Sequence, residues 1–183
     1  MSEELLVRHC APTMAGIKTA AMFNYHYEDE HSLHESVCAF NKIMVPKGMC
    51  MIVLRRQHGT ALIYLYRPNM LKSDLSDSLG KSILDERGYP TNNINRCLWR
   101  LRDRLSESPE FPHEIGLFLG YPPEDVKGFI DNKAESAKCV GFWKVYGDEK
   151  AAEEKFRQYR QCIGSYCKHY SKYHSLERLL VAT

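Results

Sequence analysis

Two runs of mostly apolar, β-prone residues separated by a short turn constrain the fold of this chain more than any other feature. The runs are MCMIVLRR at 49–56 and TALIYLYR at 60–67, and QHG lies between them. Valine, isoleucine and tyrosine suit the pleated surface of a sheet, and a short turn with glycine joins antiparallel neighbours. The pattern therefore predicts a β-hairpin.

Apolar residues at helical spacing lie on both sides of the predicted hairpin. We expect a first helix that begins after Cys10, with Pro12 in its first turn, and a second that begins at Ser32 and ends at Met44. Strands are expected over residues 114–119 and in CVGFWKVYG, residues 139–147. Further helices are expected over Leu71–Leu79, from a cap at Thr91 to Leu105, from Pro122 to Ile130, and from a cap at Asp148 onward.

Chain length and composition favour a single folded domain. The 183 residues are 44% hydrophobic and 26% charged, which is enough apolar material for one core and too little chain to expect two domains. We therefore predict one globular domain over residues 1–183. Its class would be α+β, with a small, mostly antiparallel sheet covered by helices.

Charge, hydropathy and cysteine usage narrow the classes of function. A net charge of +2 provides no strong field to attract nucleic acid, so no nucleic-acid partner is expected. No apolar run approaches the roughly 20 residues that span a bilayer, and the N-terminus lacks the features of a secretory signal. Seven cysteines without a CxxC pair are typical of free thiols in a reducing compartment. We expect a cytoplasmic protein without membrane contact.

One cysteine and one histidine are candidates for nucleophilic catalysis. Cys10 adjoins the predicted helix start, where the helix dipole favours a thiolate, and His113 begins the predicted strand in HEIGLFLGY. In this hypothesis Cys10 is the nucleophile and His113 the base. Glu114 or Asp131 would orient the imidazole, and Asn132 is an alternative to Asp131. The protein would then be a hydrolase or an acyl transferase.

Two segments resemble the corresponding parts of papain-like and bacteriocin-processing cysteine peptidases. The segments are CAPTMAGIKTAAMF and HEIGLFLGY, which follow in the same order along the chain. The resemblance implies that the α+β fold could be papain-like. The chain departs from the pattern at Glu3 and Glu4, because acids stand where those enzymes place a glutamine for the oxyanion hole.

Other functions remain open for the same residues. Cys10 could be a buried thiol, and the His113 ring could cap backbone groups. His9, Cys10 and His113 could instead ligate a metal ion, in a non-enzymatic protein that binds a metal, a haem or a redox partner. A purely structural interaction module is a third possibility. The sequence names no cofactor, and the partner could be a small molecule or a protein.

Arginines are spaced along one face of the helix expected after Thr91. Arg96, Arg100 and Arg104 follow at intervals of four residues. Such a stripe could hold a phosphate, but a solvated helix face explains it as well. Arg67, at the end of the predicted hairpin, could reach a site or pair with an acid.

Four segments together resemble a bacterial family called Domain of Unknown Function 3793. They are CAPTMAGIK, YLYRP, FPHEIGLFLGYPPEDVKGFI and GFWKVYGD, and they extend from Cys10 to the final helix. The resemblance implies a compact cytoplasmic bacterial protein and supplies no catalytic residue. It draws attention to Cys10, His113, Glu114 and Arg67, which are polar and lie inside the matching segments.

Overall fold

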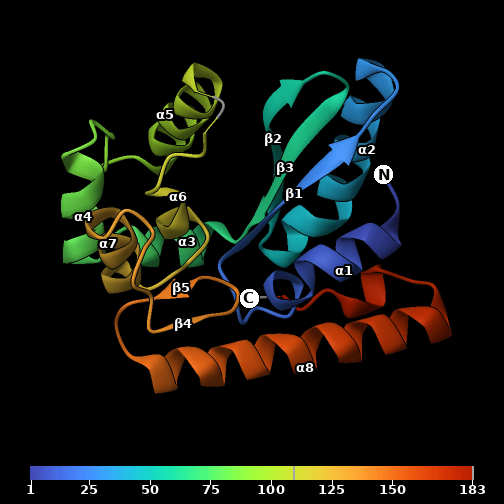
Figure 1. Ribbon diagram of the computed structural model, residues 1–183. Helices are drawn as coiled ribbons and strands as arrows, with labels where there is room; N and C mark the ends of the chain where they lie inside the picture. The colour runs from blue at the N-terminus through green and yellow to red at the C-terminus, as the bar shows by residue number, and fades with distance from the viewer. Residues whose placement is uncertain (109, 183) are drawn as a thin grey trace. The chain divides into compact units, whose positions relative to one another are not determined.

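The computed structural model describes residues 1–108 and 110–182, and the chain divides into two compact units (Figure 1). The first unit comprises residues 1–69 and 159–183, and the second comprises residues 70–158. Helices and a small antiparallel sheet make up the structure, which confirms the α+β class. The prediction of a single domain over residues 1–183 stays a prediction.

The first unit contains a three-stranded antiparallel sheet in the order β1-β3-β2. The predicted hairpin is confirmed as β2 and β3, with Thr60 opposite Gln57 next to the turn. A register shift between Val53 and Arg55 marks a bulge in β2. The elements of this unit are α1 (Glu3–Met14), β1 (Ala20–His26), α2 (Glu30–Met44), η1 (Val45–Lys47), β2 (Cys50–Gln57), β3 (Thr60–Tyr66) and η2 (Glu177–Leu179).

One face of this sheet forms the main core. The odd-numbered residues of β3 belong to a buried cluster with apolar residues of α1 and α2. Because side chains alternate along a strand, these residues share one face of the sheet. They are Ala61, Ile63 and Leu65. The two helices therefore cover the same face.

Strand β1 occupies a segment in which the sequence predicted a helix. The predicted start after Cys10 is wrong, because α1 begins at Glu3, where Ser2 accepts a hydrogen bond from the backbone of Leu5. The chain leaves the helix through Gly16, whose φ of 76° is easy only for glycine. The residues that follow then pair with β3 along its whole length. Pairing with β3 thus determines the structure of this segment, although its apolar residues are spaced as in a helix.

The second unit is mainly helical. The predicted strand over residues 114–119 is wrong: these residues form a single helical turn, α6. A short apolar run fits a buried helical turn as well as a buried strand. Gly116 packs so closely that an added Cβ would lie 2.8 Å from a methyl group of Val126 on α7. Close packing of α6 on α7 therefore decides the local structure. The remaining elements are α4 (Ser78–Asp85), α5 (Ile94–Glu107), α6 (Ile115–Phe118), α7 (Pro123–Asp131), β4 (Cys139–Val140) and β5 (Lys144–Val145).

Two helices contain the boundaries between the units, α3 (Pro68–Asp74) and α8 (Glu149–Tyr173). The predicted cap of the final helix is confirmed, since the Asp148 side chain accepts from the backbone of Ala151 at 3.0 Å. The predicted caps at Ser32 and Thr91 are wrong. Asp29 and Asn93 cap these helices instead, each accepting a backbone hydrogen bond three residues ahead.

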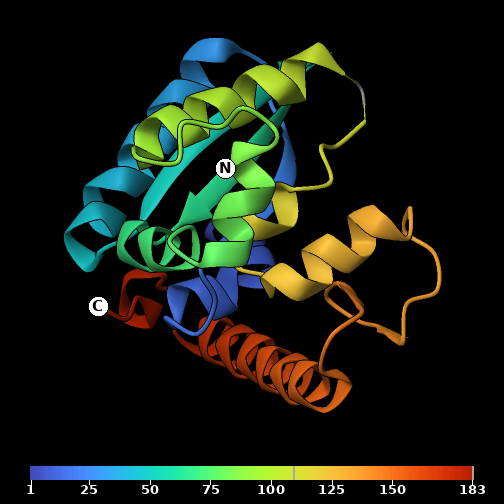
Figure 2. The same ribbon diagram turned by 90° about the vertical axis from the view of Figure 1, so that its left-hand side faces the viewer.

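The segment after α7 carries only a small sheet. Residues 139–147 were predicted as one strand, whereas the structure has two antiparallel two-residue strands, β4 and β5, in a long loop visible in Figure 2. Over residues 1–108 and 110–182, no helix has the length and apolar character needed to cross a bilayer.

Candidate functional site

Cys10 lies in the interior of α1 and is fully buried. It is two turns beyond the first residue of the helix, too far to benefit from the helix N-terminus. Burial raises the pKa of its thiol from 9.0 to about 12, because the thiolate is poorly solvated there. At neutral pH the side chain is therefore an uncharged thiol in the core.

Lys18 is a buried cation beside this thiol. Its ammonium group donates a hydrogen bond to the carbonyl of Ala20. Burial lowers the pKa of Lys18 from 10.5 to about 8, and its charge partly opposes the rise in the pKa of Cys10. The two groups form a buried titratable pair, which the sequence did not indicate.

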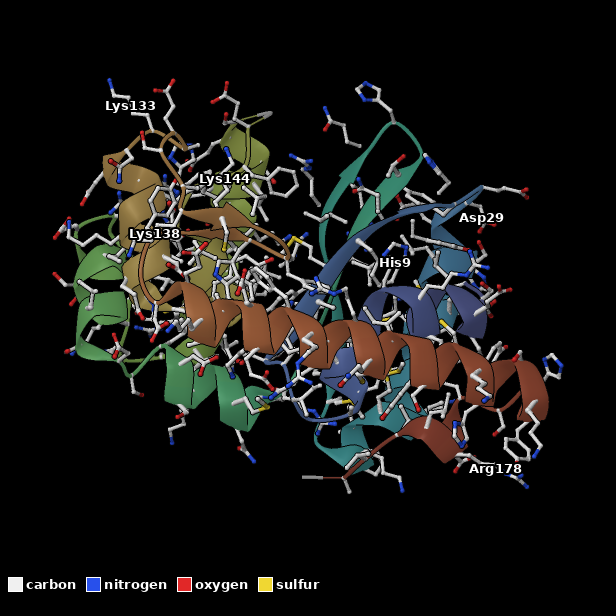
Figure 3. The ribbon with its side chains drawn as sticks, turned by 60° about the horizontal axis from the view of Figure 1, so that its bottom comes forward. His9, Asp29, Lys133, Lys138, Lys144 and Arg178 are labelled. Carbon is white, nitrogen blue, oxygen red and sulfur yellow. The ribbon has the colours of Figure 1, made fainter. Side chains whose placement is uncertain are left out.

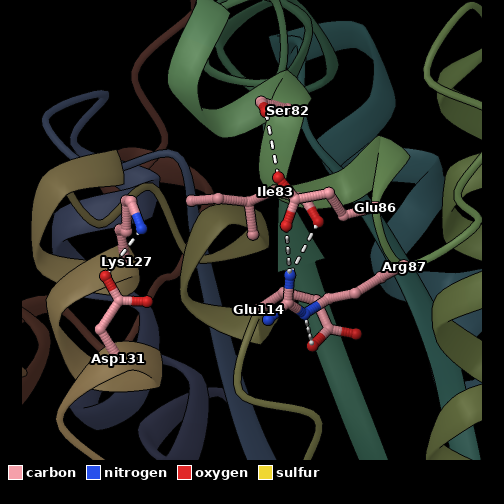
Figure 4. Close-up of polar contacts among 7 residues, drawn as sticks. All are labelled: Ser82, Ile83, Glu86, Arg87, Glu114, Lys127 and Asp131. Atoms are coloured by element: carbon pink, nitrogen blue, oxygen red, sulfur yellow. Dashed lines mark hydrogen bonds and ion pairs between the residues drawn. The ribbon is translucent and has the colours of Figure 1, made fainter.

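The three other predicted catalytic residues lie in the second unit and point to different neighbours. The exposed His113 ring makes an edge-to-face contact with Phe129, with ring centroids 5.2 Å apart. Asp131 pairs at 2.7 Å with Lys127, one turn earlier on α7 (Figure 4). Glu114 is buried and faces other partners. Among the residues that the structure describes, no two of these three are hydrogen-bonded to each other.

Glu114 is the centre of a buried ion cluster. Only 1% of its side chain is exposed, and its carboxylate accepts from the hydroxyl of Tyr89 at 2.9 Å. Arg104 Nε lies 2.9 Å from one carboxylate oxygen and Arg87 Nε lies 3.5 Å from the other. The hydrogen bond and the charge of Glu114 raise the pKa of Tyr89, which burial raises most. This carboxylate holds two arginine side chains, and its predicted role in orienting His113 stays a prediction.

An apolar pocket of about 300 Å³ lies beside His113 in the second unit. This volume is near the lower end of the range for sites that bind small molecules, roughly 300–1,000 Å³. Phe111 and Val140 are 42% and 70% exposed, so apolar side chains also stand at its rim. The residues that define the pocket include His113, Tyr121, Phe129, Val140, Trp143 and Lys144.

Aromatic contacts build one wall of this pocket. Tyr121 stacks on Trp143 with ring centroids 4.9 Å apart, and Phe156 makes an edge-to-face contact with the indole at 4.5 Å. Such contacts fix ring orientation and add to area burial. Burial raises the pKa of Tyr121 to about 12, so its hydroxyl is uncharged at neutral pH. The wall is therefore rigid and without charge.

Asp125 anchors the pocket loop to α7. Its buried carboxylate accepts from the Trp143 indole N–H at 2.7 Å and from the backbone N–H groups of Tyr146 and Gly147 at 2.7 Å each. A buried carboxylate with three donors is well satisfied. Asp125 thus positions Trp143, and its carboxylate oxygens are already occupied by these three donors.

Three lysines belong to the loop that follows α7 (Figure 3). Lys144 donates to the carbonyl of Ala134 at 2.7 Å and lies 5.9 Å from the Phe129 ring centroid. Lys138 donates to the carbonyl of Gly147 at 2.6 Å. Both ammonium groups therefore hold loop carbonyls, and Lys144, like Asp125, is a charged residue of the pocket lining.

Arg67 is a structural clamp of the first unit. Its fully buried guanidinium donates to the carbonyls of Thr13, Met14 and Val181 at 2.6–2.7 Å. Burial lowers its pKa. These contacts satisfy backbone carbonyls of α1 and of residue 181, so Arg67 holds these parts of the unit together.

The metal alternative named His9, Cys10 and His113. His9, which Figure 3 labels, stacks on Phe23 with ring centroids 5.2 Å apart, and Cys10 is buried. In the described part of the chain, no three His, Cys, Asp or Glu side chains are grouped so that they could hold a metal ion.

The fold and the pocket define a small α+β protein with an aromatic, ligand-sized cavity. The chain belongs to the family described as "Protein of unknown function (DUF3793)", whose sequence profile matches residues 6–180. The resemblance found in the sequence is thereby confirmed. No curated protein and no solved structure is significantly similar to the chain.

The most informative site residues carried no sequence signal. Arg87 and Tyr89 lie in ERGYP, between the helix expected over Leu71–Leu79 and the cap expected at Thr91. Trp143 lies in a segment that was interpreted as a strand. The pair His113–Glu114 drew attention to a residue at a cavity and to a residue in an ion cluster, and a shared role of the two stays a prediction.

Proposed function

We propose that the protein is a non-enzymatic small-molecule binding protein and that its site is the apolar pocket beside His113. The observation that carries the proposal is the preformed aromatic wall of Trp143 and Tyr121 around a cavity of about 300 Å³. Apolar pockets with a few polar groups are typical of ligand sites. The ligand would insert an aromatic ring or a short alkyl group.

Trp143 provides a direct readout of binding. The chain has two tryptophans, so an NMR spectrum of labelled protein contains two indole N–H signals. Trp99 is 62% exposed and lies on α5, and the change Trp99→Phe assigns its signal. The neutral probe 2-(2-naphthyl)ethanol should shift the Trp143 signal saturably and leave the Trp99 signal in place. If neither signal moves, or if both move without saturation, the proposal fails.

A variant at the rim makes the test specific to this pocket. Val140→Asp places a charge at a position that is 70% exposed, which should weaken probe binding by about tenfold with little effect on folding. Val45 is 56% exposed and lies in the first unit, so Val45→Asp is the matched control and should bind like the wild type. Equal binding by both variants would remove the pocket as the site.

The thiol enzyme is the second candidate. Lys18 favours it, because a buried cation beside Cys10 opposes the effect of burial on the thiol. The dyad of Cys10 with His113 stays a prediction, as does the orienting role of Glu114 or Asp131. The alkylation experiment in the Discussion separates this candidate from the binding protein.

A further inference from the structure

A second, polar cleft adjoins the apolar pocket. It has a volume of about 280 Å³, and Arg87, Arg104 and Glu114 help to line it. The segment Phe111–His113 lines both cavities. A ligand that rests on this segment can therefore reach an apolar pocket on one side and two arginines on the other.

Buried Glu114 orients the two guanidinium groups. Each arginine directs its Nε toward this carboxylate, at 2.9 Å for Arg104 and at 3.5 Å for Arg87, and Figure 4 shows the Arg87 contact. Arg87 also donates from Nη1 to the carbonyl of Ile83 at 3.1 Å. Guanidinium groups held by a fixed carboxylate are preorganised, so little side-chain entropy is lost when they bind another group.

Terminal nitrogens of both arginines remain available in the cleft. Arg104 pairs with Glu114 and lies over the Tyr89 ring, and within residues 1–108 and 110–182 its two terminal amino groups have no hydrogen-bond partner. Nη2 of Arg87 likewise has none there. The two side chains are 29% and 23% exposed. These donors can form charge-assisted hydrogen bonds with an incoming anion.

The charges of the cleft favour a singly charged anion. The two arginines and Glu114 leave one net positive charge. Glu107 also lines the cleft but pairs with Arg100 at 2.9 Å, and Glu110 lines it as an exposed acid. A dianion such as a phosphate monoester would meet more repulsion from these acids than a carboxylate would.

We propose that the ligand is a monocarboxylic acid with an aromatic or short alkyl tail. The tail enters the apolar pocket, and the carboxylate binds to Arg104 and Arg87 across the Phe111–His113 segment. This inference rests on the proposed function, because it names the class of ligand for the same pocket.

Matched probes separate the two proposals. 2-Naphthylacetic acid and 2-(2-naphthyl)ethanol share ring and chain length and differ in the terminal group, and 2-naphthyl phosphate supplies a dianion. At neutral pH the acid should bind at least about tenfold more tightly than the alcohol, because of charge-assisted hydrogen bonds. Raising the salt concentration from about 0.05 to about 0.5 M should weaken binding of the acid but not of the alcohol.

Two variants test whether the polar cleft causes the preference for the acid over the alcohol. Arg104→Gln should bring the acid close to the alcohol in affinity while the alcohol binds as before, which also shows that the pocket is intact. Arg96→Gln changes an arginine of the same helix outside the cleft and should keep the preference for the acid. If Arg104→Gln does not fold, the salt series on the wild-type protein decides whether charge contributes to binding of the acid.

Each outcome has one meaning. Equal affinity for acid and alcohol overturns the carboxylate inference and leaves the apolar binding site in place. Tighter binding of the phosphate than of the acid overturns the monocarboxylate class. Binding of neither naphthyl compound overturns both proposals.

Discussion

Arg104 Nε lies 2.9 Å from the carboxylate of Glu114, whose side chain is 1% exposed, whereas the arginine remains 29% exposed. The acid is thus fixed inside the second unit and the base extends toward solvent. A buried carboxylate thus holds partly exposed guanidinium groups in place. The ion pairs stabilise the second unit locally, and the exposed guanidinium groups are the ones proposed to bind the ligand.

The first prediction concerns this ion cluster. Glu114→Gln should lower the free energy of unfolding by about 2–4 kcal/mol, because it leaves two arginines without their charge partner. Glu107→Gln breaks an exposed pair with Arg100 and should change stability by less than about 0.5 kcal/mol. Urea titrations followed by circular dichroism measure both. Similar values for the two variants would contradict a structural role for Glu114.

The second prediction concerns thiol reactivity. Iodoacetamide should modify exposed Cys38 first and should leave Cys10 unmodified in the folded protein, since burial keeps that thiol protonated. Mass spectrometry of proteolytic peptides gives the rate for each site. Denatured protein is the control in which Cys10 should react at an ordinary rate. Fast modification of Cys10 in the folded state would favour the thiol enzyme over the binding protein.

The third prediction concerns pH and Lys18. Its folded pKa of about 8 lies below its ordinary value of 10.5, so the unfolded state binds more protons between these values and stability from this group rises with pH. Relative to Lys18→Met, the wild type should gain about 1 kcal/mol between about pH 7 and pH 9. Unfolding titrations at both pH values test this. Parallel pH profiles for the two proteins would contradict a buried ammonium.

The fourth prediction uses two glycines. A Cβ at Gly128 would lie 2.4 Å from the Cβ of Tyr146, so Gly128→Ala should destabilise the protein by about 1–3 kcal/mol. Gly164 lies in the exposed interior of α8 with nothing within 4 Å of such a Cβ. Gly164→Ala should therefore stabilise by about 1 kcal/mol, since glycine disfavours helix. Thermal unfolding should shift in opposite directions for the two variants.

The sequence correctly predicted the elements that depend on residues within or next to the element itself. The hairpin formed by β2 and β3, the helix after Pro122 and the cap at Asp148 depend on turn residues, proline and a side-chain acceptor close to the element itself. Strand β1 and helix α6 depend on which distant residues they meet. β1 exists because β3 offers a partner edge, and the α6 turn packs closely against Val126.

The candidate site could be predicted only in part, for the same reason. His113 does lie at a cavity, and Glu114 does have a special environment. Their partners are Phe129, Arg104 and Tyr89, which lie 10 to 25 positions away and belong to three different segments. Nothing in the spacing of these residues along the chain indicates that they meet.

The clamp made by Arg67 has a consequence for the order in which the chain acquires its structure during synthesis. Its guanidinium joins the carbonyls of Met14 and Val181, so the first unit closes only after the ribosome has made residues that are 114 positions beyond Arg67. Residues 70–158, by contrast, are continuous and emerge earlier. The sequence of the pocket-bearing unit is therefore complete before that of the sheet-bearing unit, which waits for residues 159–183.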